Sequence, residues 1–194
     1  LNEDVRSLAG VPSWMLTLLN KLLEKTGKKY IDEIWNNLEV YFHGGVSFNP
    51  YRNEFENIIS NKGFKFYEIY NASEGFFAIQ DSNERNDLLL MLDYGIFYEF
   101  ISIDDGNKKE KIIDLSQVEL GINYAMLITT NSGLWRYKIG DTVKFTSLNP
   151  YRIIVSGRTK HYINTFGEEV IIDNVENALE KVIKVHQCKI VDYT

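Results

Sequence analysis

Apolar residues in the first third of the chain follow helical and strand-like spacings in turn. Between Pro12 and Gly27 they recur at helical spacing, which predicts an amphipathic helix over residues 12–26. The run LEVYF is short, rich in β-formers and followed by HGG, which is typical of a buried strand entering a loop. This LEVYF strand covers residues 38–42. In the same part of the chain we also predict helices over 30–35 and 50–60.

From Phe64 onward the pattern changes to short β-rich runs separated by glycines, charged turns and Asn-Pro. In this arrangement Asp141, which follows a glycine, lies at the tip of a hairpin. From about Tyr162 we expect two short strands and a helix over 175–185. The strands predicted before that point are 64–70, 75–80, 88–93, 96–103, 123–130, 133–138, 142–147 and 151–156.

The predicted fold class is therefore α/β: an α/β layer that passes into a β-rich subdomain, followed by the beginning of a second unit. Asp173 and Glu176 are spaced as a capping box for the last predicted helix. No internal repeat and no low-complexity segment interrupts this organisation.

Composition and charge restrict the class of protein. The chain has 194 residues, 44% of them hydrophobic and 13% aromatic, which is enough for a sizeable core. A net charge of −6, with acidic and basic residues well mixed, argues against nucleic acid as a partner, so any anionic ligand must be held locally. No apolar run approaches the length of a membrane span. The single cysteine, Cys188, cannot form an internal disulfide, which favours a cytoplasmic location. We also expect a monomer without nucleic-acid or membrane partners.

The usual catalytic and metal-binding arrangements are missing from the sequence. The three histidines, His43, His161 and His186, show no ligand spacing with Cys188, which disfavours a structural zinc site. There is neither a GxSxG elbow nor a GxxxxGK[ST] phosphate loop. A hydrolase built on Ser73 would need a histidine and an acid to which the sequence does not point.

Three short stretches carry residues suited to nucleotide chemistry. NASEG offers the Ser73 hydroxyl and a Glu74 carboxylate that could hold the Mg²⁺ of a triphosphate. IGD offers Asp141, whose carboxylate could accept both vicinal hydroxyls of a ribose. GRTK places Arg158 and Lys160 between the β-rich part and the next unit. Taken alone, each is more often an ordinary polar turn or linker.

The order HGG, NASEG, IGD and GRTK is that of the adenylate-forming superfamily, which activates carboxylates with ATP. Within it, the chain closely resembles the auxin-responsive-promoter family of acyl acid amido synthetases, and most of all its bacterial branch. The resemblance extends over nearly the whole chain. It is carried by GVPSWMLTLLN at 10–20, FHGGVSFNPYR at 42–52, YNASEGFFAIQ at 70–80, LLMLDYGIFYEF at 89–100 and NSGLWRYKIGDTVKFTSLNPYRIIVSGRTKHYINTFGEE at 131–169.

The resemblance implies a role for each motif residue. Glu74 would ligate the Mg²⁺ bound to ATP, and Ser73 would hydrogen-bond a phosphate. Asp141 would hold the ribose hydroxyls, and Arg158 would contact ribose or phosphate. Lys160 would be the hinge about which a small C-terminal domain turns between the two half-reactions.

Five further residues are implied to bind the nucleotide. Tyr70 would pack on the adenine ring. Backbone groups would line the base or its surroundings at Gly44, Gly45, Asn71 and Ala72.

The implied cofactors are ATP and Mg²⁺, and the implied substrates are a small carboxylic acid and an amino acid. Asn164, where thioester-forming relatives often carry lysine, favours amide formation. Two alternatives stay open: an acyl-CoA or thioester-forming ligase of the same superfamily, and a relative that binds a nucleotide or a partner without catalysis.

The resemblance also implies a domain division. Residues 1–157 would be the C-terminal part of the large adenylating domain, residues 158–161 the hinge, and residues 162–194 the start of the small α+β domain. The phosphate-wrapping loop is expected before Leu1 and the catalytic lysine after Thr194. We therefore expect an internal piece of a longer enzyme, inactive when isolated.

Overall fold

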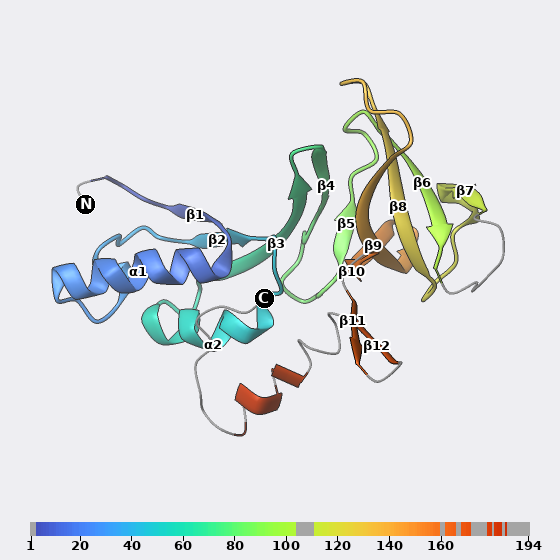
Figure 1. Cartoon of the computed structure of the whole chain (residues 1–194). Coiled ribbons are helices and arrows are strands. Elements are labelled where there is room, and N and C mark those ends of the chain that lie inside the picture. The colour runs from blue at the N-terminus through green and yellow to red at the C-terminus, as the bar shows by residue number, and fades with distance from the viewer. Residues whose placement is uncertain are drawn as a thin grey trace. The chain divides into compact units, whose positions relative to one another are not determined.

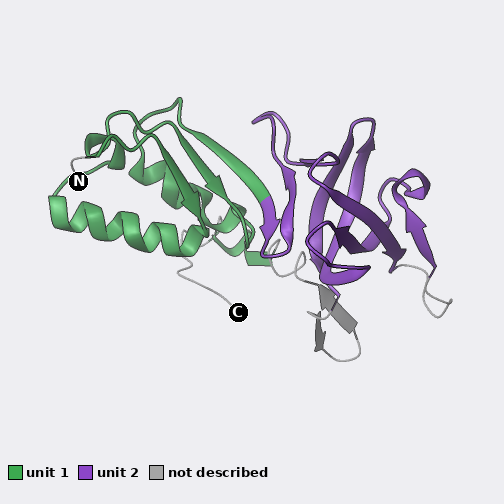
Figure 2. Cartoon of the chain, turned by 90° about the horizontal axis from the view of Figure 1, so that it is seen from above, with its two compact units in different colours: residues 1–69, 176–194 green, residues 70–175 purple. Residues whose placement is uncertain are grey.

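The computed structural model describes residues 3–103, 111–159, 162–165 and 168–171, and helical residues 178–179, 181–183 and 185. The chain divides into two compact units, one formed by residues 1–69 with 176–194 and the other by residues 70–175 (Figure 2). Within the described residues, no helix is both long and apolar enough to cross a membrane.

The first unit contains a parallel three-stranded arrangement with two helices (Figure 1). The middle strand, β2, pairs with β1 on one side and β3 on the other, both in parallel. Helix α1 connects β1 to β2, and α2 connects β2 to β3, so each connection is a βαβ crossover. The elements are β1 (Ser7–Gly10), α1 (Pro12–Thr26), the 3₁₀ turn η1 (Ile31–Glu33), β2 (Val40–His43), α2 (Asn49–Ile58) and β3 (Lys65–Ala72).

Aromatic side chains join the helices and strands of the first unit. Tyr41 of β2 stacks on Phe55 of α2 with ring centroids 4.8 Å apart, and neither ring is exposed. Phe48 lies beside both of them. Burial of rings of this size is the main stabilising contribution available to a core of this kind.

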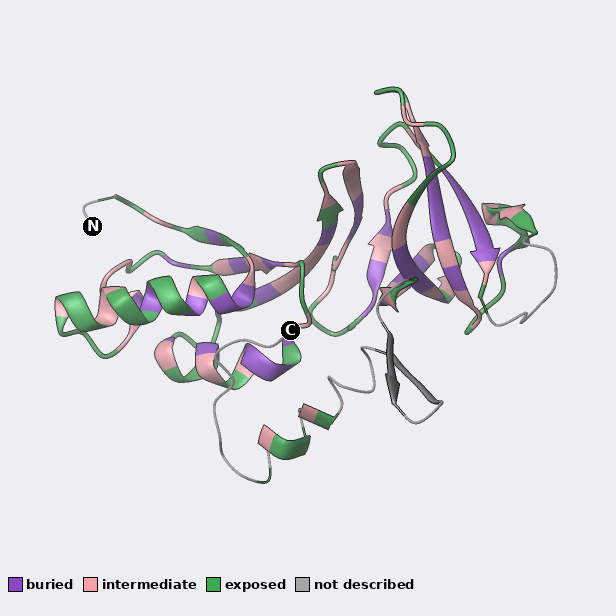
Figure 3. Ribbon diagram, viewed as in Figure 1, coloured by how far each residue is buried: buried purple, intermediate pink, exposed green. Residues whose placement is uncertain are grey.

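The second unit is an antiparallel sheet with the strand order β4-β5-β10-β9-β8-β6-β7. Its core contains fully buried Phe77, Phe100 and Phe145, and Figure 3 shows the buried stretches along β8 and β9. Strands β11 (Tyr162–Thr165) and β12 (Glu168–Ile171) form a separate pair. The other elements are β4 (Gly75–Ile79), β5 (Leu88–Leu90), β6 (Ile96–Ser102), β7 (Ile112–Asp114), the 3₁₀ turn η2 (Leu115–Gln117), β8 (Asn123–Thr130), β9 (Tyr137–Leu148) and β10 (Tyr151–Arg158).

Most predicted elements are confirmed, and α1 and β8 have the predicted bounds. The helix predicted over 30–35 is wrong, since it is only the 3₁₀ turn Ile31–Glu33. Strands β1 and β7 and the turn η2 were not predicted. Of the helix expected over 175–185, residues 178–179, 181–183 and 185 are helical, while its capping residues Asp173 and Glu176 lie outside the described residues.

The two strands predicted over 133–138 and 142–147 are one strand, β9, and the hairpin turn lies earlier, at residues 131–136. There, the Thr130 amide donates to the carbonyl of Leu134 and closes the turn. Asp141 is therefore inside a strand, and its predicted position at a hairpin tip is wrong. Gly140, with φ of 93°, bends β9 without ending it.

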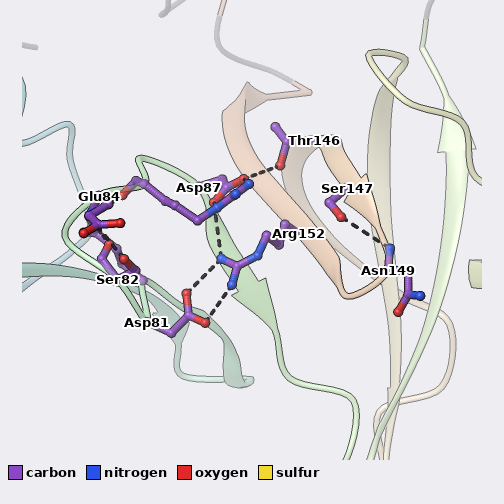
Figure 4. Close-up of polar contacts among 10 residues, drawn as sticks. Asp81, Ser82, Glu84, Asp87, Thr146, Ser147, Asn149 and Arg152 are labelled. Carbon is purple, nitrogen blue, oxygen red and sulfur yellow. Dashed lines mark hydrogen bonds and ion pairs between the residues drawn. The ribbon is translucent and has the colours of Figure 1, made fainter.

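An ion-pair cluster fixes the connection between β4 and β5 (Figure 4). Arg152 of β10, only 8% exposed, donates two hydrogen bonds to Asp81 at 2.8 and 2.7 Å and a longer one to Asp87 at 3.3 Å. Asp87 also accepts bonds from Arg85 and Thr146. The hydrogen bonds from Arg85, with help from Thr146, lower the pKa of Asp87 to about 2. Through Thr146 and Arg152, these hydrogen bonds attach the β4–β5 connection to β9 and β10.

We predict that Arg152→Met lowers the free energy of unfolding by roughly 3 kcal/mol at pH 7, because it removes a buried cation that bonds the buried Asp87 and the more exposed Asp81. Arg6→Met is the control, since Arg6 and its partner Asp4 both have side chains more than half exposed, and its loss should cost no more than ~1 kcal/mol. Urea denaturation of the two variants measures both effects. Equal losses would show that Arg152 is not the centre of the cluster.

Candidate nucleotide site

Asp141 lies in a bulge of β9. Along the β8 side, Ala125 pairs with Thr142 but Leu127 pairs with Lys138, so residues 139–141 of β9 face a single residue of β8. The carbonyl of Gly140 accepts a 2.7 Å hydrogen bond from the amide of Thr159. Bulges of this kind re-aim a side chain, and here the side chain is the Asp141 carboxylate.

Both oxygens of the Asp141 carboxylate accept hydrogen bonds from distant parts of the chain. The Tyr70 hydroxyl donates to Oδ2 at 2.8 Å, and Nε of Arg158 donates to Oδ1 at 2.8 Å. Asp141 is 8% exposed, and it stands opposite Arg158 in the pairing of β9 with β10. A buried carboxylate needs such donors, because an unpaired one would be costly.

The two donors keep their protons over the ordinary pH range. Burial, with the added effects of the Asp141 charge and hydrogen bond, raises the pKa of Tyr70 well above its usual value. The hydrogen bond to Asp141 raises the pKa of Arg158, and the charges of Asp141 and Glu74 add to this shift. Through their hydrogen bonds, Tyr70 of YNASEG and Arg158 of GRTK meet at the Asp141 carboxylate.

Ser73 and Glu74 form the turn between the end of β3 and the start of β4. Ser73 and Asn71 are exposed, whereas Ala72 and Glu74 are half-buried. In the part of the chain that the structure describes, no hydrogen bond or ion pair occupies the Glu74 carboxylate or the Ser73 hydroxyl.

This turn fits a magnesium ion that brings its own oxygen ligands. Mg²⁺ is commonly held by one or two carboxylates together with phosphate oxygens and water. Within the described residues there is no cluster of three or more histidine, cysteine or acidic side chains able to hold a metal.

The HGG motif lies in the first unit, whereas Tyr70, Asn71, Ala72, Ser73, Glu74, Asp141 and Arg158 belong to the second. A Cβ on Gly44 would overlap the carbonyl oxygen of Ile69, so the close approach of these two backbones requires glycine. Gly45 is exposed. The predicted contribution of these two glycines to the nucleotide site stays a prediction.

Lys160 lies outside the described residues, so its role as a hinge also stays a prediction. Arg158 ends β10, and Thr159 follows it beside the bulge of β9. Sequence reasoning missed the roles of Thr159 and of the Tyr70 hydroxyl in the surroundings of Asp141. Tyr70 and Asp141 are 71 residues apart, and no local pattern signals their contact.

The family of the chain follows from two matches along it. Residues 1–64 match the GH3 family N-terminal domain, and residues 89–158 match the GH3 family central domain. The chain belongs to the GH3 family. The predicted resemblance to the auxin-responsive-promoter amido synthetases is thereby confirmed.

Relatives of the GH3 chain agree with this assignment. It is 25% identical over 143 residues to an indole-3-acetic acid-amido synthetase, GH3.8, of Oryza sativa subsp. indica, a match that covers 65% of this chain and 23% of that protein. Other curated relatives are covered over 15% and 19% of their length, so the chain spans less than a quarter of these three proteins.

Solved structures show the fold of the GH3 chain. The acyl acid amido synthetase AtGH3.15, in complex with 2,4-DB, matches with a TM-score of 0.69 at 18% identity, over 89% of this chain and 32% of that one. A 2-hydroxyisobutyryl-CoA ligase in the postadenylation state matches with a TM-score of 0.66 at 16% identity, over 92% and 38%. The predicted α/β fold class is confirmed by this shared fold.

His43, beside the two glycines, is a buried base. It is 2% exposed and stacks on Phe48 with centroids 4.0 Å apart. Among the described residues, neither of its ring nitrogens has a hydrogen-bond partner. Burial, reinforced by the charge of Arg52, lowers its pKa to about 4.

We predict that His43 makes the chain sensitive to mild acid. The unfolded histidine binds a proton near pH 6.5 and the folded one near pH 4, so stability is lost as the pH falls between these values, by up to ~3 kcal/mol. His43→Phe keeps a stacking ring and should remove this dependence. The measurement is the unfolding free energy at pH 7 and pH 4.5.

The control is Thr130→Val, which also removes a buried polar atom unpartnered among the described residues but no titratable group. Its effect should be the same at both pH values. An undiminished acid sensitivity in His43→Phe would assign the proton uptake to another group.

Proposed function

We propose that a longer protein containing this chain activates a carboxylic acid with MgATP and transfers the acyl group to the amine of an amino acid. Support comes from GH3 membership and from relatives that are named amido synthetases. The observation that carries the proposal is the meeting of Tyr70 and Arg158 at the Asp141 carboxylate, in the unit that also holds the Glu74 turn. The chain's small share of its relatives' length is why the activity is assigned to a longer protein.

Asp141 supplies the ribose contact in this proposal. A carboxylate has about four acceptor sites on its two oxygens, and the donors from Tyr70 and Arg158 occupy one on each. One acceptor site per oxygen is left for a pair of vicinal hydroxyls. The contact needs no movement of Arg158 away from Asp141.

In this proposal, Ser73 and Glu74 supply the contacts to the phosphate groups and their metal ion. The exposed Ser73 hydroxyl can donate to a phosphate oxygen, and Glu74 can ligate the metal. Mg²⁺, when bound, would offset the negative charge that develops on the phosphate oxygens during transfer.

The proposed reaction has two half-reactions. A carboxylate oxygen of the acid attacks the α-phosphate of ATP, and pyrophosphate leaves with the electrons of the broken P–O bond. The amine then attacks the acyl carbon of the adenylate, loses a proton and expels AMP. Positioning and electrostatic stabilisation do the catalysis, and no covalent intermediate with the chain is required.

A thioester-forming ligase is the second candidate, since a CoA ligase shares the fold. The GH3 matches and Asn164 favour the amide product. Assaying amino acids against coenzyme A as acyl acceptors, in the full-length protein, distinguishes the two. A relative that binds a nucleotide without catalysis would form neither product.

The finer predictions from the sequence complete the proposal. They comprise residues 1–157 as part of the large domain, residues 158–161 with Lys160 as the hinge, and residues 162–194 as the start of the small domain. A cytoplasmic location, a monomeric state, the absence of nucleic-acid or membrane partners and a bacterial origin also stay predictions.

We predict that Glu74→Gln in the full-length protein lowers carboxylate-dependent exchange of pyrophosphate into ATP by at least ~10²-fold, because a charged metal contact in a closed site is worth several kcal/mol. Glu84→Gln is the control, since Glu84 is an exposed carboxylate on the β4–β5 connection. Near wild-type exchange by Glu74→Gln at saturating Mg²⁺ would refute the metal-ligand role.

A further prediction concerns the 194-residue chain by itself. It should catalyse no pyrophosphate exchange and bind ATP far more weakly than the full-length protein, because the phosphate loop and the catalytic lysine are expected in other segments. Exchange assays and calorimetric titration with ATP test this. Exchange by the purified chain would show that these groups are misassigned.

A further inference from the structure

We propose that Ser156 is a positioning residue. As the extra residue of a bulge in β10, it turns Arg158 onto the face of the sheet where Asp141 lies, so that the two side chains can meet a ribose together. The inference deepens the proposed function and rests on it, because the ribose is that of the nucleotide. Ser156 lies outside the motifs HGG, NASEG, IGD and GRTK, and it acts on the ligand only through Arg158 and Asp141.

The alternation of side chains along β9 and β10 is the first observation. Val155 of β10 pairs with Val143 of β9, so their side chains share one face, and both belong to the core of the second unit or pack against it. Asp141 lies two residues before Val143 and keeps that face. Arg158 lies three residues after Val155, and in a regular strand it would point to the opposite face. One extra residue in β10 is therefore needed for Arg158 to meet Asp141.

The bulge in β10 supplies this extra residue. The ladder resumes with Gly157 opposite Thr142, which leaves Ser156 as the additional residue of the strand. Gly157 has a φ of 144°, a conformation that favours glycine and allows the strand to bend here. Directly after the bulge, Arg158 stands opposite Asp141 and donates to its carboxylate at 2.8 Å. The ion pair thus depends on where the bulge lies.

Two buried hydrogen bonds hold Ser156 in the bulge. Its hydroxyl donates to Oδ1 of Asn123 on β8, and its oxygen lies 2.9 Å from the Thr142 hydroxyl on β9. Because a serine hydroxyl has a single proton, Thr142 is the donor of the second bond. Ser156 is 2% exposed and Thr142 is 3% exposed, so a hydroxyl without its bond there would be costly. The chain Thr142–Ser156–Asn123 joins three neighbouring strands.

This chain of hydroxyls connects the two bulges of the site. Thr142 directly follows Asp141, the last residue of the bulge in β9, and Ser156 is the bulge in β10. Their hydrogen bond fixes one distortion relative to the other. The carboxylate of Asp141 and the half-exposed guanidinium of Arg158 are then held in one arrangement. A ribose can be bound without the entropic cost of ordering the groups that bind it.

The test measures the affinity of the full-length protein for MgATP by calorimetric titration. Ser156→Ala should weaken binding roughly five- to tenfold, as expected for the loss of one net hydrogen bond that positions the site. In an Arg158→Met background, Ser156→Ala should weaken binding by less than about twofold, because Ser156 acts through Arg158. A merely structural loss would weaken binding equally in the two backgrounds.

Variants of Thr142 separate affinity from stability. Thr142→Val combined with Ser156→Ala removes both hydroxyls, so the free energy of unfolding should recover above that of Ser156→Ala while MgATP binding stays weak. Thr142→Ser keeps the donor and should keep the wild-type affinity, whereas Thr142→Val alone should weaken binding as Ser156→Ala does. Thr146→Val is the control, because Thr146 is on the same strand but donates to Asp87. It should bind MgATP as the wild type does.

The outcomes separate this inference from the proposed function. A wild-type protein that binds no MgATP would overturn both. MgATP binding that Ser156→Ala leaves unchanged, or weakens equally with and without Arg158, would overturn the positioning role alone. Should Ser156→Ala fail to fold, Thr142→Val and Thr142→Ser decide. Weakened binding in the valine variant only would support the role, and equal affinities in these two variants would refute it.

Discussion

A carboxylate buried inside a β-sheet is the constraint on which the site depends. Asp141 is shielded from water, so its charge must be met by donors from the protein. The donors come from the last residues of β3 and of β10, and the carboxylate comes from the middle of β9. A single charge thus joins β3 to the consecutive strands β9 and β10, which lie far from it in sequence. The bulge around Gly140 is the local distortion that makes this possible.

Strand β10 carries a basic residue near each end, and each one pairs with a buried carboxylate. Arg152 donates hydrogen bonds to Asp81 and Asp87 at the start of the strand, and Arg158 donates one to Asp141 at its end. The first cluster fixes the connection that follows β4, and β4 itself follows the Glu74 turn. The turn is therefore held between two fixed segments, Tyr70 before it and the β4–β5 connection after it. A ligand site gains precision when it is built on such supported elements.

What the sequence could predict was the part of the fold that depends on local pattern. Helix α1 has Pro12 at its start and Gly27 after its end, and helical spacing between them was sufficient. The residues of the site could also be named, because their motifs are contiguous. The 3₁₀ turn at Ile31, the single strand β9 and the edge strand β1 were missed. Short exposed edges carry little pattern, and a bulge resembles a turn in sequence. The hydrogen bond from Tyr70 to Asp141 joins residues 71 positions apart, so no short stretch of sequence contains both.

The charges of the site indicate in which form a nucleotide would bind. Among the described residues, Arg158 is already paired with Asp141, and Glu74 adds a further negative charge nearby. The four groups Tyr70, Glu74, Asp141 and Arg158 therefore sum to a net negative charge. In a chain whose formal charge is −6, a bare triphosphate would meet repulsion at this position. A metal–nucleotide complex would meet less repulsion, because Glu74 could hold the divalent cation, whose charge would offset part of that of the phosphates. The acidic character of the protein is thus compatible with an anionic substrate, provided that metal and nucleotide arrive together.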